Sequence, residues 1–198
     1  PISLGDGLRV RRRAGPFRLD VRWQEGAPAS DLGPPDQNLV WRAWQAMGAP
    51  AGWDIELQKA MPAGGGLGAG SSDAALVLRL LARVQGLAPD APELRARAAS
   101  LGSDVPFFLG SEAAWCTGRG IEIEPAGPGV ELHGVVICGE ERIGTADAYR
   151  RLDAQSRRVP ADPGPMRKAW RACDPDAVLA SVANDFEGVV PAGGSLSE

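Results

Sequence analysis

The sequence has few of the residues that usually build metal centres and disulfide frameworks. Its 198 residues include a single histidine, His133, and three cysteines, Cys116, Cys138 and Cys173. The spacing between the cysteines fits neither a paired metal knuckle nor a set of disulfides, so we expect reduced and mostly buried thiols. His133 falls in an expected strand without a plausible triad or metal partner, and we interpret it as structural.

The sequence also lacks an excess of basic charge and long apolar runs. The formal net charge is −4, and the one compact basic cluster, Arg11 to Arg13, lies in an alternating segment that we interpret as a solvated strand face. We therefore expect no nucleic-acid partner. The apolar runs fall short of the roughly 20 residues that a membrane span requires, and the first residues lack the pattern of a signal peptide. We expect a cytoplasmic protein that does not contact membranes.

The rest of the composition is that of an ordinary globular protein. Hydrophobic residues make up 44% and charged residues 23% of the chain, while 26 glycines and 17 prolines indicate many turns. The length suits one large domain or two small ones. A segment rich in proline and glycine at residues 125–130 is a candidate boundary between two subdomains.

Hydrophobic periodicity predicts a mixture of strands and helices. Residues 7–23 alternate and break at Ala14-Gly15-Pro16, which predicts an antiparallel hairpin. Further strands are expected at 53–57 and 132–138, with a hairpin around 117–119. Helices are expected at 38–47, 72–85, 91–100, 145–152, 166–172 and 177–190, the third beginning with a capping box of Asp90 and Glu93. Because strands and helices do not alternate strictly, the pattern favours an α+β fold.

The most informative segment is a glycine-rich loop before a long apolar helix. Residues 62–75 read PAGGGLGAGSSDAA, with five glycines and two serines ahead of the apolar stretch. Glycines let an anion approach the backbone amides, and the positive end of the helix dipole favours negative charge there. The loop therefore predicts a phosphate-binding site.

Two common phosphate loops do not fit this segment. A Walker A loop requires a lysine after its last glycine, and Ser71 stands at that position. A dinucleotide-binding loop requires an acidic residue about twenty positions later, at the end of a second strand, and that region here is a turn around Pro89.

The loop instead resembles that of the GHMP kinases, which include galactokinase, homoserine kinase and mevalonate kinase. Its extended form is similar to the branch of that family that phosphorylates 4-diphosphocytidyl-2-C-methyl-D-erythritol. Three further segments resemble motifs of the same branch in matching order: DQNLV at 36–40, LGSDVPFF at 101–108 and NDFE at 184–187.

This resemblance implies a fold and an activity. The fold would be α+β, with a ribosomal protein S5 domain 2-like ATP-binding domain over residues 1–127 and the start of a ferredoxin-like domain over 128–198. The activity would be ATP- and Mg²⁺-dependent phosphorylation of the 2-hydroxyl of a cytidyl diphosphate sugar alcohol, in non-mevalonate isoprenoid synthesis. A monomer or weak homodimer is expected.

The resemblance also assigns roles to individual residues. Asp104 would orient or deprotonate the substrate hydroxyl, although an aspartate there could simply cap the next turn. Thr145 and Tyr149 would contact the substrate, or else cap a helix and pack. The ATP-binding residues would be Asn38, Pro62, Ala63, Gly64, Gly65, Gly66, Leu67, Gly68, Ala69, Gly70, Ser71 and Ser72, with Ser72 also holding Mg²⁺.

Simpler roles compete with two of those assignments. Asn38 heads a helix after a proline-rich loop, so it could be no more than an N-cap. One of the two serines, Ser71 or Ser72, could likewise be only the N-cap of its helix.

Two family motifs have no counterpart in the sequence. One is the first strand, with a lysine that assists phosphoryl transfer and a following G-Y-H segment; the other is a second glycine-rich segment near the end. The chain would be either an excerpt or a truncated protein, and a truncated protein would bind ATP weakly with little turnover. Another GHMP kinase, of the homoserine or mevalonate type, and a non-catalytic nucleotide-binding module are the alternatives.

Overall fold

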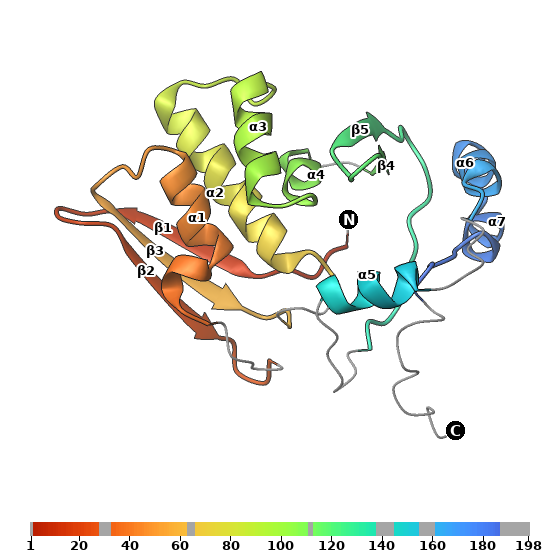
Figure 1. Cartoon of the computed structure of the whole chain (residues 1–198), viewed down its shortest axis with the longest axis horizontal. Coiled ribbons are helices and arrows are strands. Elements are labelled where there is room, and N and C mark those ends of the chain that lie inside the picture. Colours follow the sequence, from red (N-terminus) through yellow and green to blue (C-terminus); the bar gives the residue numbers. More distant parts are fainter. Residues whose placement is uncertain are drawn as a thin grey trace. The chain divides into compact units, whose positions relative to one another are not determined.

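The chain divides into two compact units, residues 1–125 and 126–198. The computed structural model describes residues 2–27, 33–62, 66–110, 113–137, 145–154 and 161–186. The elements of both units are labelled in Figure 1. The division falls within the segment expected to hold a boundary, while the assignment of the second unit to a kinase C-terminal domain stays a prediction.

The first unit is built on a three-stranded sheet. Strands β1 (Gly7–Arg12) and β2 (Arg18–Trp23) flank β3 (Trp53–Lys59) in the order β1-β3-β2. Strand β3 pairs antiparallel with β1 and parallel with β2. It takes the centre because its alternate side chains Trp53, Ile55 and Leu57 are all buried.

The predicted hairpin over residues 7–23 is therefore wrong. Both strands exist, but β3 lies between them. The turn that joins them binds the residue before β3 instead of closing a two-stranded ladder. Gly52 donates its N–H to the carbonyl of Gly15 at 3.0 Å and accepts from the N–H of Arg13 at 3.1 Å. Alternation identifies a strand but does not say which strand it pairs with.

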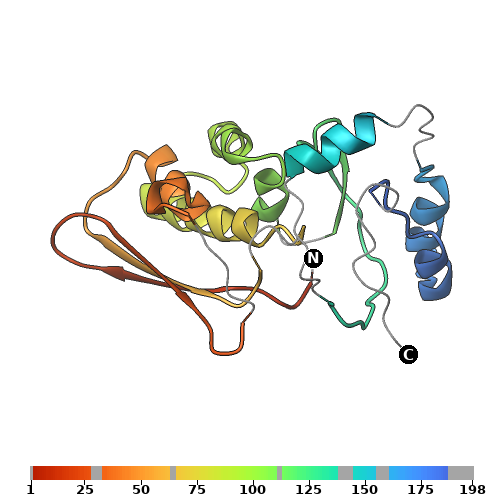
Figure 2. The same cartoon turned by 60° about the horizontal axis from the view of Figure 1, so that its bottom comes forward.

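Two helices cover one face of this sheet, as Figures 1 and 2 show. They are α1 (Leu39–Ala46), which follows the short 3-10 helix η1 (Pro35–Gln37), and α2 (Ala69–Gln85). Two further helices, α3 (Pro92–Leu101) and α4 (Val105–Leu109), contact α2. The core between these layers includes the fully buried side chains of Ile55, Leu57, Val77, Leu78, Val40 and Leu94.

The N-termini of α2 and α3 differ from the prediction. Helix α2 begins at Ala69, three residues earlier than expected, because Gly68 takes the left-handed conformation that ends the loop. The capping box predicted for α3 is wrong. Ala91 is the N-cap of α3, which makes no side-chain capping bond in the described structure, and Pro92 supplies the preset backbone angle of the first turn.

The hairpin predicted around residues 117–119 is confirmed as the antiparallel pair β4 (Ala114–Thr117) and β5 (Glu122–Pro125). The expectation of buried thiols is wrong where it can be checked. Cys116 lies on β4 and Cys173 in the turn after an α-helix, and both are free and exposed. Cys138 lies outside the described residues.

The described residues of the second unit form three short helices. They are α5 (Thr145–Asp153), α6 (Gly164–Arg171) and α7 (Pro175–Ala180). The strand predicted at 132–138 is not formed: residues 130–137 are all described and are neither helical nor paired, and His133 is exposed there. Helix α7 ends at Ala180 rather than near residue 190, with Ser181 as its C-cap.

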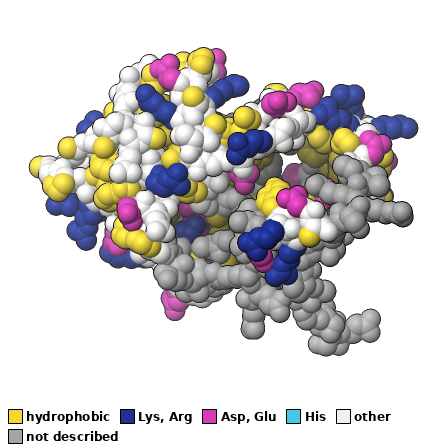
Figure 3. Space-filling view, in the orientation of Figure 1, with side chains coloured by type: hydrophobic (Ala, Val, Ile, Leu, Met, Phe, Trp, Pro, Cys, Tyr) yellow, Lys and Arg dark blue, Asp and Glu magenta, His cyan; other side chains and the backbone are white. Residues whose placement is uncertain are grey.

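The described surface carries mixed charge. Basic and acidic side chains are interspersed over the face in Figure 3. On the outer side of the sheet, for example, Arg9 pairs with Glu56 at 3.4 Å. None of the helices in the described ranges is long and apolar enough to cross a bilayer.

Gly68 generates a prediction about how the loop meets α2. Its φ is +69°, and a Cβ there would lie 2.9 Å from two ring carbons of Phe108. We expect Gly68→Ala to lower the free energy of unfolding by about 2 to 4 kcal/mol, from backbone strain plus overpacking. Gly66→Ala is the matched control, because Gly66 has φ +73° but an added Cβ meets nothing within 4 Å. We expect that variant to lose only about 1 kcal/mol.

Denaturant unfolding followed by circular dichroism measures both variants. Equal losses for the two would show that the contact between Gly68 and Phe108 does not constrain the loop.

Candidate functional site

The start of α2 presents backbone donors that have no acceptor within the helix. Its first helical hydrogen bond runs from the N–H of Ser72 to the carbonyl of Gly68 at 2.9 Å. The N–H groups of Ala69, Gly70 and Ser71 precede that bond and therefore have no partner in α2, all of whose residues are described. The N-cap is a glycine without a side chain to occupy them. This end of α2 thus fits an anion.

The two serines lie inside the first turn of α2. The N-cap is Gly68, so the alternative that Ser71 or Ser72 serves only as the N-cap is wrong. Both serines are half-buried. Their assignment to ATP and to Mg²⁺ stays a prediction. Of the other predicted loop residues, Pro62, Gly66 and Leu67 are described, whereas residues 63–65 lie outside the described ranges.

Asp104 stands at the start of α4, but it does not cap that helix. Its side chain makes no capping hydrogen bond within the described structure. Instead it is exposed and accepts a hydrogen bond from the Ser103 hydroxyl at 3.1 Å. Helix α4 also carries Phe108, which lies against Gly68. The same short helix therefore links the predicted base to the glycine loop.

The charge of Asp104 acts on Cys116 of strand β4. Burial raises the pKa of the Cys116 thiol, and the negative charge of Asp104 raises it further. Cys116 is thus close enough to Asp104 for that carboxylate to raise the pKa of its thiol.

Asn38 is an N-cap, as one of the two interpretations expected. Its Oδ1 accepts a hydrogen bond from the N–H of Val40 at 2.9 Å. The next residue, Leu39, lies 3.6 Å from the position of a Cβ on Gly70. The start of α1 is therefore beside the glycine loop, and contact between Asn38 and a nucleotide base stays a prediction.

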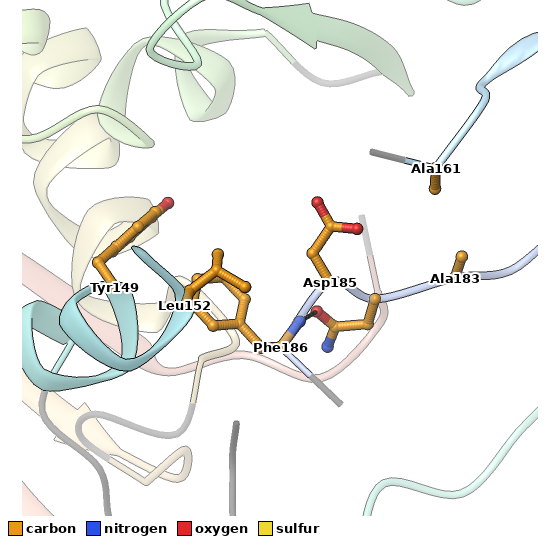
Figure 4. Close-up of a pocket in the computed structure, with 7 residues that line it drawn as sticks. Tyr149, Leu152, Ala161, Ala183, Asp185 and Phe186 are labelled. Atoms are coloured by element: carbon orange, nitrogen blue, oxygen red, sulfur yellow. Dashed lines mark hydrogen bonds between the residues drawn. The ribbon is translucent and has the colours of Figure 1, made fainter. Parts of the chain in front are cut away.

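The two residues predicted to contact substrate lie in the second unit. Tyr149 lines a pocket of about 380 Å³ with Asn184, Asp185 and Phe186, and its ring meets that of Phe186 edge-on at 5.0 Å. Figure 4 shows the Tyr149 hydroxyl and the Asp185 carboxylate directed to the same side of this pocket. Thr145 is the first residue of α5, and its side chain lies outside the described part.

The structure adds a cluster that the sequence patterns did not identify. The Lys59 ammonium lies 3.1 Å from Oδ2 of Asp73 and also contacts Oδ2 of Asp6. Asp6 in turn accepts the backbone N–H groups of Ala60 at 2.7 Å and Met61 at 2.9 Å through Oδ1. All three charged side chains are at least nine-tenths buried.

A signal for this cluster was present in the alternation of β3. Buried side chains recur at Trp53, Ile55 and Leu57, and continuing the same period of two places Lys59 on the core face. Asp73 likewise falls among apolar residues at the buried start of α2. A buried lysine needs a carboxylate partner, so the two positions could have been paired.

The two carboxylates of the cluster share one cation, and their pKa values shift in opposite directions. Burial raises the pKa of Asp73 to about 7, with the Asp6 carboxylate raising it further and Lys59 opposing both. Burial also acts to raise the pKa of Asp6, but the hydrogen bonds from Lys59, Met61 and Ala60 outweigh it and hold that pKa below its ordinary value. Asp6 therefore carries the stable negative charge of the cluster.

The raised pKa of Asp73 predicts a pH-dependent stability. The folded chain binds the Asp73 proton more tightly than the unfolded chain, so this contribution is complete below about pH 4 and is lost as the pH rises through about 7. We expect the free energy of unfolding of the wild type to fall over that range relative to Asp73→Asn, which cannot titrate. Denaturant titrations of both proteins across the range measure the difference, and a difference that does not change with pH would contradict the assignment.

Comparison with known proteins gives a consistent result. Residues 38–112, from the N-cap of α1 to the end of α4 and just beyond, match the family model described as GHMP kinases N terminal domain. Proteins named 4-diphosphocytidyl-2-C-methyl-D-erythritol kinase are similar to most of the chain. The protein from Solidesulfovibrio magneticus is 41% identical over 93% of this chain, and that from Synechococcus elongatus is 35% identical over 96%. The chain spans 64% of the length of each of these relatives.

Solved structures share the fold. A crystal structure of 4-(cytidine 5'-diphospho)-2C-methyl-D-erythritol kinase matches with a TM-score of 0.60 at 29% identity, covering 92% of this chain and 63% of that one. Homoserine kinase from Cytophaga hutchinsonii matches with a TM-score of 0.63 over 91% of this chain and 63% of its own, at 15% identity, which shows the fold alone. The α+β fold expected from the sequence is thereby confirmed as that of the GHMP kinases. Family model, relatives and fold together identify residues 38–112 as a GHMP kinases N terminal domain.

Proposed function

We propose that this chain binds ATP at the start of α2 and forms part of a kinase that phosphorylates 4-diphosphocytidyl-2-C-methyl-D-erythritol on its 2-hydroxyl. The observation that carries the proposal is the set of first-turn amides of Ala69, Gly70 and Ser71, which have no helical acceptor. The names of the relatives supply the substrate, because each of those proteins is named as a kinase of this compound.

The nucleotide phosphates would bind against the first turn of α2. The three amides would donate to phosphate oxygens, and the hydroxyls of Ser71 and Ser72 would add contacts from the same turn. The described residues contain no group of three or more carboxylate, cysteine or histidine side chains able to hold a metal alone. Mg²⁺ would be held by the ATP phosphates, and the family resemblance adds the Ser72 hydroxyl. Bound Mg²⁺ would neutralise charge on the transferred phosphoryl group.

Asp104 would act on the acceptor hydroxyl. Its carboxylate is exposed, is not used for capping, and belongs to the helix that lies against the loop through Phe108. A carboxylate in that position can orient the attacking oxygen and accept its proton as the bond to phosphorus forms.

Lys59 is not assigned to the phosphoryl group. Its side chain is only 4% exposed and is paired with two carboxylates, so its charge is already compensated within the fold. An ammonium that assists transfer must reach the reacting phosphate.

The family motif assigns Thr145 and Tyr149 of the second unit to substrate binding. The pocket of the second unit offers an aromatic ring, an amide and a carboxylate, which suit a ligand with hydroxyl and amine donors. This part of the proposal rests on the resemblance and on the lining of the pocket.

Substitution of Asp104 tests the catalytic assignment. In the natural gene product that carries this chain, we expect Asp104→Asn to lower kcat by about 10²- to 10⁴-fold while leaving ATP affinity nearly unchanged, because only proton transfer and hydroxyl orientation are lost. Asp54→Asn, on the solvent side of β3, is the matched control. A coupled assay of ADP release with the cytidyl diphosphate substrate measures both variants.

Other outcomes of the same assay would overturn the proposal. Retention of turnover by Asp104→Asn within about tenfold of the wild type would remove Asp104 from the mechanism. Turnover of homoserine or mevalonate in place of the cytidyl substrate would assign a different member of the family. ATP binding without transfer to any of these alcohols would favour a nucleotide-binding module.

A further inference from the structure

The buried cluster of Asp6, Lys59 and Asp73 joins the two ends of the glycine loop. Lys59 is the last residue of β3, where the loop begins, and Asp73 lies just past the first turn of α2, where it ends. Asp6 comes from a third segment, directly before β1. The ammonium of Lys59 therefore bridges the strand side and the helix side of the loop at its base.

Asp6 fixes the strand side in a second way. Its Oδ1 accepts the N–H groups of Ala60 and Met61, the two residues that join β3 to the glycine loop, while its Oδ2 contacts Lys59. One carboxylate thus holds both the start of the loop and the lysine that reaches the helix. With the Asp6 side chain fully buried and that of Lys59 4% exposed, water competes little for these contacts.

The composition of the loop explains why contacts that fix its two ends are needed. Five of its residues between Pro62 and Ser71 are glycine, and glycine loses more conformational entropy on ordering than any other residue. A phosphate site works best when its donors are already in place before the ligand binds. Contacts that fix both ends of the loop would supply that order without themselves reaching the ligand.

We propose that Asp6, Lys59 and Asp73 form a clamp across the base of the glycine loop, and that these positioning residues hold the first-turn amides of α2 ready for phosphate. The effect of the clamp on phosphate binding rests on the proposed ATP site. The clamp itself is defined by contacts within the chain. A buried ion pair is weak ground for expecting extra stability, since apolar replacements are often as stable. The clamp is therefore expected to affect loop order more than global stability.

Two substitutions of Asp73 separate the effect of its contact with Lys59 from the effect of its negative charge. Asp73→Asn and Asp73→Ala both remove the carboxylate, and both leave Lys59 paired with Asp6, so neither strands a buried charge. Only asparagine keeps an oxygen that can accept from the Lys59 ammonium. Glu56→Gln is the control on the solvent face of the same strand, where it weakens the pair with Arg9.

Amide hydrogen exchange without ligand tests the clamp directly. We expect exchange at the N–H of Ser72, which bonds to Gly68, to rise at least about tenfold in Asp73→Ala, and to stay near the wild-type rate in Asp73→Asn and Glu56→Gln. Exchange within α3 should not change, because none of the three cluster residues lies in that helix. Equal rates at Ser72 in wild type and Asp73→Ala, or equal acceleration in the alanine and asparagine variants, would overturn the clamp.

Calorimetric titration with MgATP then tests the consequence for binding. We expect Asp73→Ala to bind at least about tenfold more weakly than Asp73→Asn, because one charge-assisted hydrogen bond separates the two. If the exchange result holds but the wild-type chain binds no ATP, the clamp stands and the proposed ATP site fails. If ATP binds equally to both variants, the clamp does not position the phosphate donors.

Discussion

A helix N-terminus binds an anion only if its amides have no other acceptor and its backbone is held in place, and this requirement organises the first unit. The left-handed Gly68 has no side chain, so the first-turn donors of α2 have no side-chain cap among the described residues. Phe108 of α4 lies against the same glycine, and Leu39 of α1 lies beside Gly70. The buried ion cluster under the loop completes the support, because it ties the end of β3 to the start of α2.

The central position of β3 makes this arrangement possible. Because the strand is paired on both sides, the position of its last residue, Lys59, is fixed. The Lys59 side chain lies on the buried face of the strand. The helix that follows packs its apolar side on the same sheet face, which brings Asp73 over Lys59. In this unit a strand paired on both sides and a packed helix thus flank the glycine-rich segment.

The sequence predicted the parts of this fold that depend on local pattern. The expected helix at 38–47 appears as α1 with Asn38 as its cap, and alternation from Trp53 located β3. Pairing was not predictable in the same way, because a strand with one apolar face can join any neighbour, and β3 came between β1 and β2. The strand expected through His133 failed for a related reason: alternating residues form a strand only when another strand supplies hydrogen bonds. Lys59 was not predicted to be buried, because the alternation of apolar residues in β3 ends at Leu57. In the structure Lys59 is the last buried side chain of that alternation.

The central claim is that the first-turn amides of α2 bind the phosphates of ATP, and a backbone amide NMR titration tests it most directly. With MgATP, saturable shifts should be largest at Ala69, Gly70 and Ser71, whereas adenosine, which has no phosphates, should leave these amides nearly unchanged. Helix α7 serves as the internal reference. Shifts of equal size with adenosine, or no shift at these three amides when ATP saturates the chain, would contradict the account.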